Sequence, residues 1–461
     1  MVCGFFSAIV ALMGGCASVD SHVSASSGTF WTPPERAALC VGDPFGNASG
    51  VPEGPLDLPT LVATAFENSP ATKKSWQAAR IAAAQSAKAS SVFFPRVSVA
   101  GTIERVESSS PQQAKTFAKV RYPSIEVQCS IFQFGGHAKS AEAARQLMYA
   151  ANYQHNRALQ TLAHCVQKCY FALDSAECAV EASERNLMDA TIAYDAAFVR
   201  HQSGLSNIQD FLQAKANKSR AEFELGNAVA CVEAARASLA NAIGVPVSGG
   251  LRIIRSADEN AIGNVDIDVG NLITETVQTR SDILASRAVA NARKNAIWSS
   301  SSKLMPELVV GGAWNRKSYG GIDGNFNGGT FFAALRWTLF DGFSNVYDMV
   351  ESRAKWKQAE QDFKQLALSV ASDVWEKYHA FKSSIKLLHA ARNCEQASQE
   401  SFDSIVISYK NGLSSFSDLM SSQTQLASAR QKTIAAKNNL SVAVVDLAYA
   451  VGVTGIENAQ K

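Results

Sequence analysis

The sequence predicts a mainly α-helical fold with a small β part. We expect two tandem repeats, each with one long antiparallel coiled-coil hairpin and two β-strands, giving four strands in all. Three observations predict this fold. Certain Phe, Tyr and Gly residues recur at a constant spacing along the chain. Two long stretches without proline carry a coiled-coil pattern, and shorter stretches alternate apolar and polar residues.

The composition excludes several classes of function. The 461 residues carry a net charge of +2, and the 18% of charged residues are mixed in sign, which gives no electrostatic reason to expect a nucleic-acid partner. The seven histidines and nine cysteines show no HExxH, CxxC or Cys/His zinc spacing, and no loop has a phosphate-binding pattern. We therefore expect no catalytic residues, no metal site and no cofactor.

Two of the cysteines, Cys165 and Cys169, lie one helical turn apart and close to an expected apolar seam. We interpret them as buried thiols. A disulfide formed in an oxidising compartment is the alternative.

Residues 1–16 have the features of an export signal. An apolar run from Phe5 to Met13 is too short to span a bilayer and closes on small residues. The letters LMGGC resemble a lipobox, so Cys16 is the predicted lipidation site and the mature N-terminus. A plain signal peptide cut near Ala17, or an unprocessed apolar start, is the alternative. Residues 17–56 are expected to form an extended segment.

The internal repeat defines the domain organisation. Four pairs of residues differ by 208 positions: Phe132 and Phe340, Tyr170 and Tyr378, Gly204 and Gly412, and Gly244 and Gly452. Pro95 and Pro306 differ by 211, so the length change between the repeats falls after the proline, where we expect a variable hairpin loop. We place the first repeat at 57–246, a Gly- and Asp-rich linker at 247–268, the second repeat at 269–454 and a tail at 455–461.

Each repeat begins with an amphipathic stretch, Leu61–Ser91 or Leu272–Ser302, which is predicted to be one helix that ends before a proline. Two strands separated by a polar loop follow. In the returning strands, the apolar positions alternate with polar ones: Ile125, Val127, Cys129 and Ile131, and then Phe331, Ala333, Leu335, Trp337 and Leu339. This apolar side either packs on a core, as in an ordinary antiparallel sheet, or faces lipid in a closed barrel.

About 70 residues without proline follow the strands in each repeat, from Gly135 to Gly204 and from Phe343 to Gly412, and they predict helices of roughly 100 Å. Their apolar positions form a narrow coiled-coil seam: Leu159, Leu162, Val166, Tyr170 and Leu173, and then Ala367, Val370, Val374, Tyr378 and Phe381. Gly204 and Gly412 suit left-handed C-terminal caps, and Ser206 with Gln209 suits a capping box. Return helices of about 40 residues should then pack antiparallel on the long ones.

Several short motifs recur in the same order in both repeats. They are IFQFGG and LFDGF before the long helix, a tyrosine within it, the Gly-Leu-Ser turn after it, and IGV or VGV at the end of the return helix. In this order the chain resembles the TolC-type outer-membrane efflux protein family, also called outer membrane factors, over roughly Leu58 to Val453. The lipobox favours the lipoprotein branch and efflux of drugs or cations. Gln133 replaces the Asp of the family's first turn.

The resemblance implies a homotrimer in which twelve strands form one outer-membrane β-barrel, continuous with a tapered α-barrel in the periplasm. Four strands cannot close a membrane barrel alone, since about eight is the smallest number that closes. The implied function is a passive exit duct of a tripartite efflux or type I secretion system, passing small molecules or proteins. Its partners would be an inner-membrane pump and a periplasmic adaptor. A periplasmic coiled-coil adaptor or a non-conducting scaffold is the alternative.

The resemblance also implies where the closed end is gated. Tyr409 and Asp418 match the family's gating Tyr and aperture Asp, and Asp210 matches Asp418 in the first repeat. Ser414 replaces the family's Arg, so a Tyr to Arg network is either missing or rebuilt with Lys410. The turns expected to dock the adaptor contain Gly204, Leu205, Ser206, Gly412, Leu413 and Ser414. Alternatively, Asp418 only stabilises a helix start and Tyr409 only packs the last turn.

Overall fold

The structure of the protein is a computed structural model. The structure describes residues 54–110, 113–246, 251–255, 268–319 and 325–453. The expected signal peptide with Cys16, nearly all of the N-terminal segment, most of the linker and the C-terminal tail lie outside the described residues.

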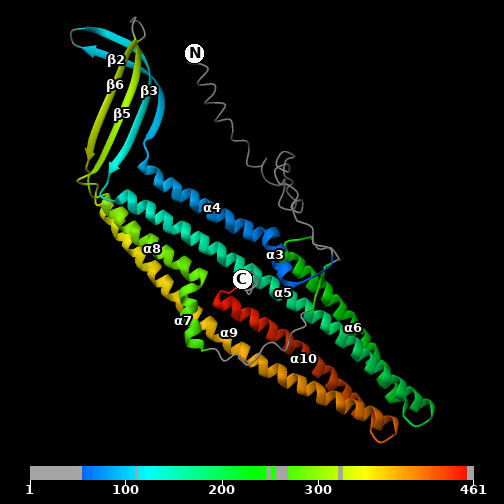
Figure 1. Cartoon of the computed structure of the whole chain (residues 1–461). Coiled ribbons are helices and arrows are strands. Elements are labelled where there is room, and N and C mark those ends of the chain that lie inside the picture. Colours follow the sequence, from blue (N-terminus) through cyan, green and yellow to red (C-terminus); the bar gives the residue numbers. More distant parts are fainter. Residues whose placement is uncertain (1–53, 111–112, 247–250, 256–267, 320–324, 454–461) are drawn as a thin grey trace. The chain divides into compact units, whose positions relative to one another are not determined.

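Both repeats contain the same series of elements (Figure 1). The first repeat contains α3 (Leu58–Asn68), α4 (Pro70–Ser90), η2 (Ser91–Phe93), β2 (Arg96–Ser110), β3 (Gln113–Phe132), α5 (Gly136–Gln202) and α6 (Ile208–Ile243). The second contains α7 (Val269–Thr279), α8 (Ser281–Ser302), β5 (Glu307–Tyr319), β6 (Asn325–Arg336), α9 (Ser344–Lys410) and α10 (Phe416–Val451). The bounds of α5 and α9, and those of α6 and α10, differ by the predicted 208 positions.

The helix expected at the start of each repeat is in fact two helices. Ser69 and Arg280 have extended backbones, with ψ values of 124° and 131°, and each separates a short helix from a longer one. Pro70 explains the first break, because a proline disfavours the helical conformation of the residue before it. No proline follows Arg280; there, the guanidinium donates to the carbonyl of Ala450, 2.7 Å away, at the end of α10.

The four long strands form one antiparallel sheet in the order β2-β3-β5-β6. Strand β6 ends at Arg336, whereas the alternating pattern predicted a strand through Leu339. The physical reason is the register: Arg336 pairs with Glu307, the first residue of β5, so later residues have no partner on that strand. The indole of Trp337 instead donates to the carbonyl of Leu304 at 3.1 Å.

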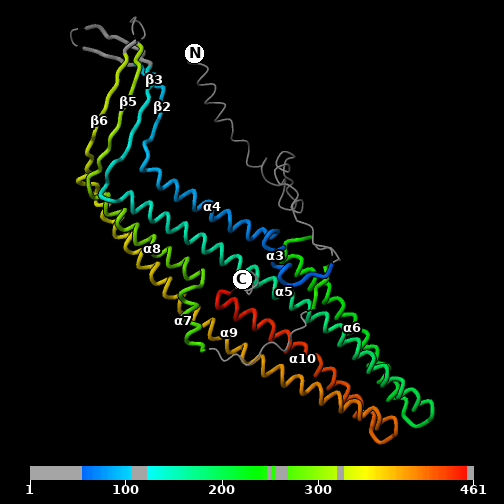
Figure 2. Tube along the Cα trace, viewed as in Figure 1, coloured from blue at the N-terminus to red at the C-terminus, as the bar shows by residue number. Residues whose placement is uncertain are grey.

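The long helices pack through the predicted seam. Helix α5 packs against α6 and α10, and α9 packs against α10 and α8, so the two hairpins lie side by side (Figures 1 and 2). Val166, Tyr170 and Leu173 of α5 are buried, as are Val370, Val374, Tyr378 and Phe381 of α9. Among the described residues, no helix is both long and apolar enough to cross a membrane.

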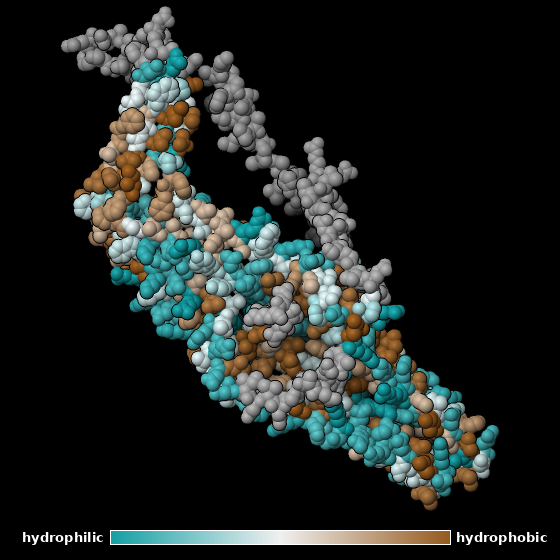
Figure 3. Space-filling view, in the orientation of Figure 1, coloured by the Kyte–Doolittle hydropathy of each residue, from teal (hydrophilic) through white to brown (hydrophobic). Residues whose placement is uncertain are grey.

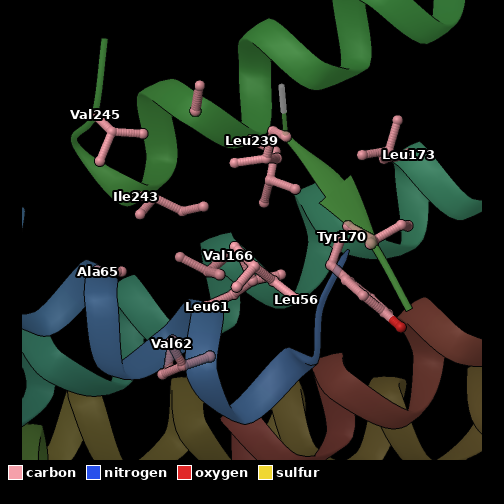
Figure 4. Packing of buried hydrophobic residues seen from close by; sticks show 14 of the residues in the cluster. Leu56, Leu61, Val62, Ala65, Val166, Tyr170, Leu173, Leu239, Ile243 and Val245 are labelled. Carbon is pink, nitrogen blue, oxygen red and sulfur yellow. The ribbon is translucent and has the colours of Figure 1, made fainter. Parts of the chain in front are cut away.

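A small parallel sheet joins the start of the first repeat to the linker. Strand β1 (Pro55–Leu56) pairs with β4 (Arg252–Ile253), and the Tyr170 hydroxyl donates to the carbonyl of Ile254 at 2.5 Å. The core beneath it is made of α3, α5 and α6; Figure 4 shows Leu61 and Val62 near Val166, with Leu239 and Ile243 above them. This core packs α3, α5 and α6 together at a position far from the hairpin tips.

Candidate functional site

One face of the four-stranded sheet is apolar and uncovered. Register places Val99, Ile125 and Trp314 in one row across the sheet, and Gly312 and Phe331 pair in the next row. Val99 is 76% exposed and Phe331 96% exposed, although both are strongly hydrophobic. Hydrophobic residues gather on the strands in Figure 3. In water, an apolar surface of this kind is normally covered by a partner or a membrane.

The opposite face of the sheet is polar where the strands meet the helices. The Ser130 hydroxyl donates to Glu307 Oε1 at 2.7 Å and lies 2.9 Å from His137 Nε2. Arg96 and Arg336 belong to the same face, because Arg96 pairs with Gln128 and Arg336 pairs with Glu307. The sheet is therefore apolar on one face and polar on the other, as the period-two alternation predicts.

At the far end of the molecule, each hairpin turns through the predicted left-handed glycine. Gly204 and Gly412 have φ values of 72° and 78°. The amides of Leu205 and Leu413 donate to carbonyls five residues earlier, both at 2.8 Å, which completes a Schellman motif. In such motifs the residue after the glycine usually packs on its own helix. Leu205 and Leu413 are instead 70% and 82% exposed.

The predicted capping box at Ser206 and Gln209 is wrong. Helix α6 begins at Ile208 and its N-cap is Asn207, which makes no side-chain capping hydrogen bond, so Ser206 lies one residue before the cap. The Ser206 hydroxyl is buried without a partner in the described residues. A capping box does form in the second repeat, at Ser415 and Asp418, which correspond to Asn207 and Asp210 of the first repeat.

Asp418 uses its carboxylate in this cap and remains exposed. Its Oδ2 accepts from the Ser415 hydroxyl at 2.6 Å and from the Ser415 amide at 3.1 Å. These bonds hold the pKa of Asp418 below its ordinary value. Asp210 lies in the first turn of α6, but no side chain of that turn caps the helix. The two acidic positions therefore differ in local structure despite their equal place in the repeat.

Tyr409 is buried at the tip and is contacted by an arginine of the other hairpin. Arg200 Nη1 donates to the Tyr409 carbonyl at 2.6 Å, and its Cζ lies 4.9 Å from the centroid of the tyrosine ring. The Tyr409 ring also packs near Phe416, with centroids 5.9 Å apart. Burial raises the pKa of Tyr409, so the phenol is neutral at neutral pH. The contact involves Arg200, not the Lys410 suggested by the sequence.

These features match those of a known family. The family model described as outer membrane efflux protein matches residues 61–245 and 272–453, most of both repeats. The chain belongs to the outer membrane efflux protein family. This identifies an efflux protein, not an enzyme.

Comparison with solved structures agrees in fold. The chain is similar to the outer-membrane channel OprN (18% identity, TM-score 0.77, covering 86% of this chain and 89% of that one). It is also similar to VceC from Vibrio cholerae, with 16% identity and a TM-score of 0.76, covering 86% of this chain and 96% of that one. The open-state MtrE channel of Neisseria gonorrhoeae is similar at 19% identity and a TM-score of 0.74, covering 92% of this chain and 98% of that one. Comparison with curated proteins finds no match.

A buried arginine of α10 joins the two hairpins of the efflux protein. Arg430 of α10 is only 7% exposed, and it donates to Asn186 at 2.8 Å and to Asp189 at 2.7 Å, both on α5. Its other terminal nitrogen donates to Gln399 of α9 at 2.7 Å. Burial raises the pKa of Asp189, and the charge of Arg430 acts in the opposite direction. Sequence reasoning did not identify this cluster.

A second polar cluster joins α5 to the end of α10. Arg157 lies over the ring of Tyr449, 3.8 Å from its centroid, and His164 Nε2 lies 2.7 Å from Asp446 Oδ1. With Arg430, these contacts fix α10 on α5 at two levels. These polar and charged contacts add to an apolar cluster that also joins the hairpins, in which Ala193 and Ala197 of α5 pack with Phe402 of α9 and Leu419 of α10.

The cysteines differ from the expected buried thiols. Cys165 is exposed and Cys169 half-buried, because they lie beside the buried seam residues rather than on the seam. Both are free, and burial together with the neighbouring Cys165 raises the pKa of Cys169 to about 11. Within the described ranges, no group of three or more His, Cys, Asp or Glu side chains could hold a metal ion.

Proposed function

We propose that three copies of this efflux protein form one exit duct through the outer membrane. The observation that carries the proposal is the sheet: four strands, one exposed apolar face, and edges at β2 and β6. Unpaired strand edges cannot face lipid, and four strands are too few to close a barrel. Three copies would pair every edge, turn the apolar face to lipid and turn the polar face to a water-filled passage.

The helices would continue this passage into the periplasm, with the hairpin tips at the inner end. A periplasmic adaptor would dock on the two Gly-Leu-Ser turns, at Gly204, Leu205 and Ser206 and at Gly412, Leu413 and Ser414. The exposure of both leucines supports this, because covering an exposed apolar side chain with a partner removes apolar surface from water, which favours binding. The adaptor would connect the duct to an inner-membrane pump, and a lipid on Cys16 would anchor the mature N-terminus.

The alternative function, a periplasmic adaptor or a non-conducting scaffold, is not favoured. A protein that works entirely in the periplasm has no use for a sheet with one apolar face in contact with solvent. The family membership also favours the duct.

The assembly can be tested on protein extracted from outer membranes in mild detergent. Native mass spectrometry is expected to find a trimer, since a single four-stranded sheet would leave two unpaired edges in lipid. A monomer recovered from correctly inserted protein would contradict the duct.

Val99→Arg should reduce the yield of membrane trimer, because a cation on the lipid-facing side costs about 2–4 kcal/mol near the bilayer centre. Ser98→Arg, on the polar face, is the matched control and should leave the yield close to wild type.

We further propose that Asp418 lines the narrowest part of the duct, with Tyr409 beside it. Asp418→Ala is expected to weaken the block of single-channel currents by divalent and trivalent cations, since three carboxylates around one axis attract such ions. The lowered pKa keeps this group ionised at neutral pH. Ser415→Ala removes the cap but keeps the carboxylate, and it should retain the block. Asp210→Ala should weaken the block much less. Unchanged block in Asp418→Ala would refute the assignment.

A further inference from the structure

The two β-hairpins of the chain have identical registers once the repeat is taken into account. Arg96 pairs with Gln128 in the first hairpin, and Glu307 pairs with Arg336 in the second. The first members of these pairs differ by 211 positions and the second members by 208, the same spacings that relate Pro95 to Pro306 and Phe132 to Phe340. The sequence spacings therefore also relate β2 to β5 and β3 to β6 in three dimensions.

Within the chain, the two hairpins are joined by the pairing of β3 with β5. This ladder is regular over Ser124 to Ser130, and it includes the pair Glu126 with Ala313. Strand β3 is the last strand of the first hairpin, and β5 is the first strand of the second. In a ring of identical chains, β6 is the last strand of one hairpin and β2 of the next copy is the first strand of the following hairpin. The two strands therefore correspond to β3 and β5.

We propose that β6 pairs with β2 of the next copy in the register of the β3–β5 ladder. This inference rests on the proposed trimer and adds its strand register. Applying the two spacings to Glu126 and Ala313 places Ala334 opposite Thr102 of the next copy. By the same operation, Arg336 lies opposite Ala100, and Leu335 lies opposite Gly101.

The side chains brought together in this way are compatible. Residues 100, 102 and 104 lie on the polar face of β2, and they meet 336, 334 and 332 of the polar face of β6. Ala333 meets Ile103 on the apolar face. No like charges are placed opposite each other in these rows, and such pairs would be destabilising. A slip of one residue would instead set the apolar positions of one strand against the polar positions of the other.

A slip of two residues preserves the faces, so the test must separate it from the proposed register. Residues paired across neighbouring strands lie close enough for a disulfide. Within one chain, β2 and β6 are opposite edges of the sheet, roughly 14 Å apart at about 4.8 Å per strand, so Cys residues at 102 and 334 cannot join within a chain.

The experiment compares three double variants in outer membranes under mild oxidation: Thr102→Cys with Ala334→Cys, Ala100→Cys with Ala334→Cys, and Glu104→Cys with Ala334→Cys. Non-reducing denaturing gels measure the covalent dimer and trimer, with the parent chain and the single variants correcting for the native cysteines. The first variant is expected to be mostly cross-linked, and each of the other two at least about fivefold less. This contrast follows from the steep dependence of disulfide formation on Cα separation.

Strongest cross-linking in either slipped pair would overturn the register. Absence of cross-linking in all three variants, with a trimer intact by native mass spectrometry, would also overturn it but leave the proposed duct standing. A monomer in the membrane would remove the duct and the register together. Reduction should return the cross-linked species to the monomer band on the denaturing gel.

Discussion

Replacing Arg430 by alanine is expected to lower the free energy of unfolding by about 3–5 kcal/mol, which is the usual cost of removing one partner from a buried ion pair. Arg430 is 7% exposed, and its guanidinium contacts two other helices, α5 through Asn186 and Asp189 and α9 through Gln399. Without it, Asp189 keeps a carboxylate whose ionised form is already disfavoured by burial. Denaturant unfolding followed by circular dichroism measures the change.

Two further variants separate charge compensation from loss of packing. Arg145→Ala removes an exposed ion pair with Glu142 within α5, and should change stability by no more than about 0.5 kcal/mol. Arg430→Met with Asp189→Leu removes the unpaired charge and retains apolar volume, so it should recover much of the loss. If Arg430→Ala is no less stable than Arg145→Ala, the cluster does not hold the hairpins together.

Arg200→Ala is expected to favour the open state of the proposed gate by about 30-fold, equivalent to about 2 kcal/mol for a charged hydrogen bond and a cation–π contact that hold the two tips together. Both contacts are made to Tyr409: one to its carbonyl at 2.6 Å and one to its ring at 4.9 Å. Because the pKa of Tyr409 is raised, the tyrosine stays neutral and the contact should persist from neutral to mildly alkaline pH. Single-channel recording of open probability measures the effect.

Lys410→Ala is the matched control, since Lys410 is the adjacent cation on α9. It should leave the open probability near that of the wild type. Opening in Lys410→Ala but not in Arg200→Ala would show that the tip is locked through a different contact. Both variants should remain trimeric, which native mass spectrometry checks before recording.

Much of the fold could be predicted because its signals are local. The left-handed caps at Gly204 and Gly412 follow from the lack of a Cβ, and the strand faces follow from side-chain alternation. Predictions failed where a local signal competed with its surroundings. The serine of the first turn has the letters of a capping box, yet the turn geometry moves the cap to Asn207.

The candidate site was less predictable because its contacts join residues distant in the sequence. Tyr409 was identified through family resemblance, whereas its partner Arg200 lies 209 positions earlier and carries no motif of its own. Arg280 lies at a helix break that no proline marks, and its guanidinium reaches the carbonyl of Ala450 at the end of α10. Arginines in amphipathic helices normally face solvent, so an arginine that makes a tertiary contact is distinguished from the others only by its burial in the folded protein.

The duplication, the lengths of the long helices, the positions of the turns and the two faces of the sheet follow from the amino-acid sequence, since each depends on periodicity or on one residue's backbone preference. The contacts that hold the two hairpins together are visible only in the folded protein. Arg430 and Arg200 both reach across from one hairpin to the other. That choice depends on which faces of α5, α9 and α10 meet, and a helical period specifies an apolar stripe but not which distant side chains will face each other beside it.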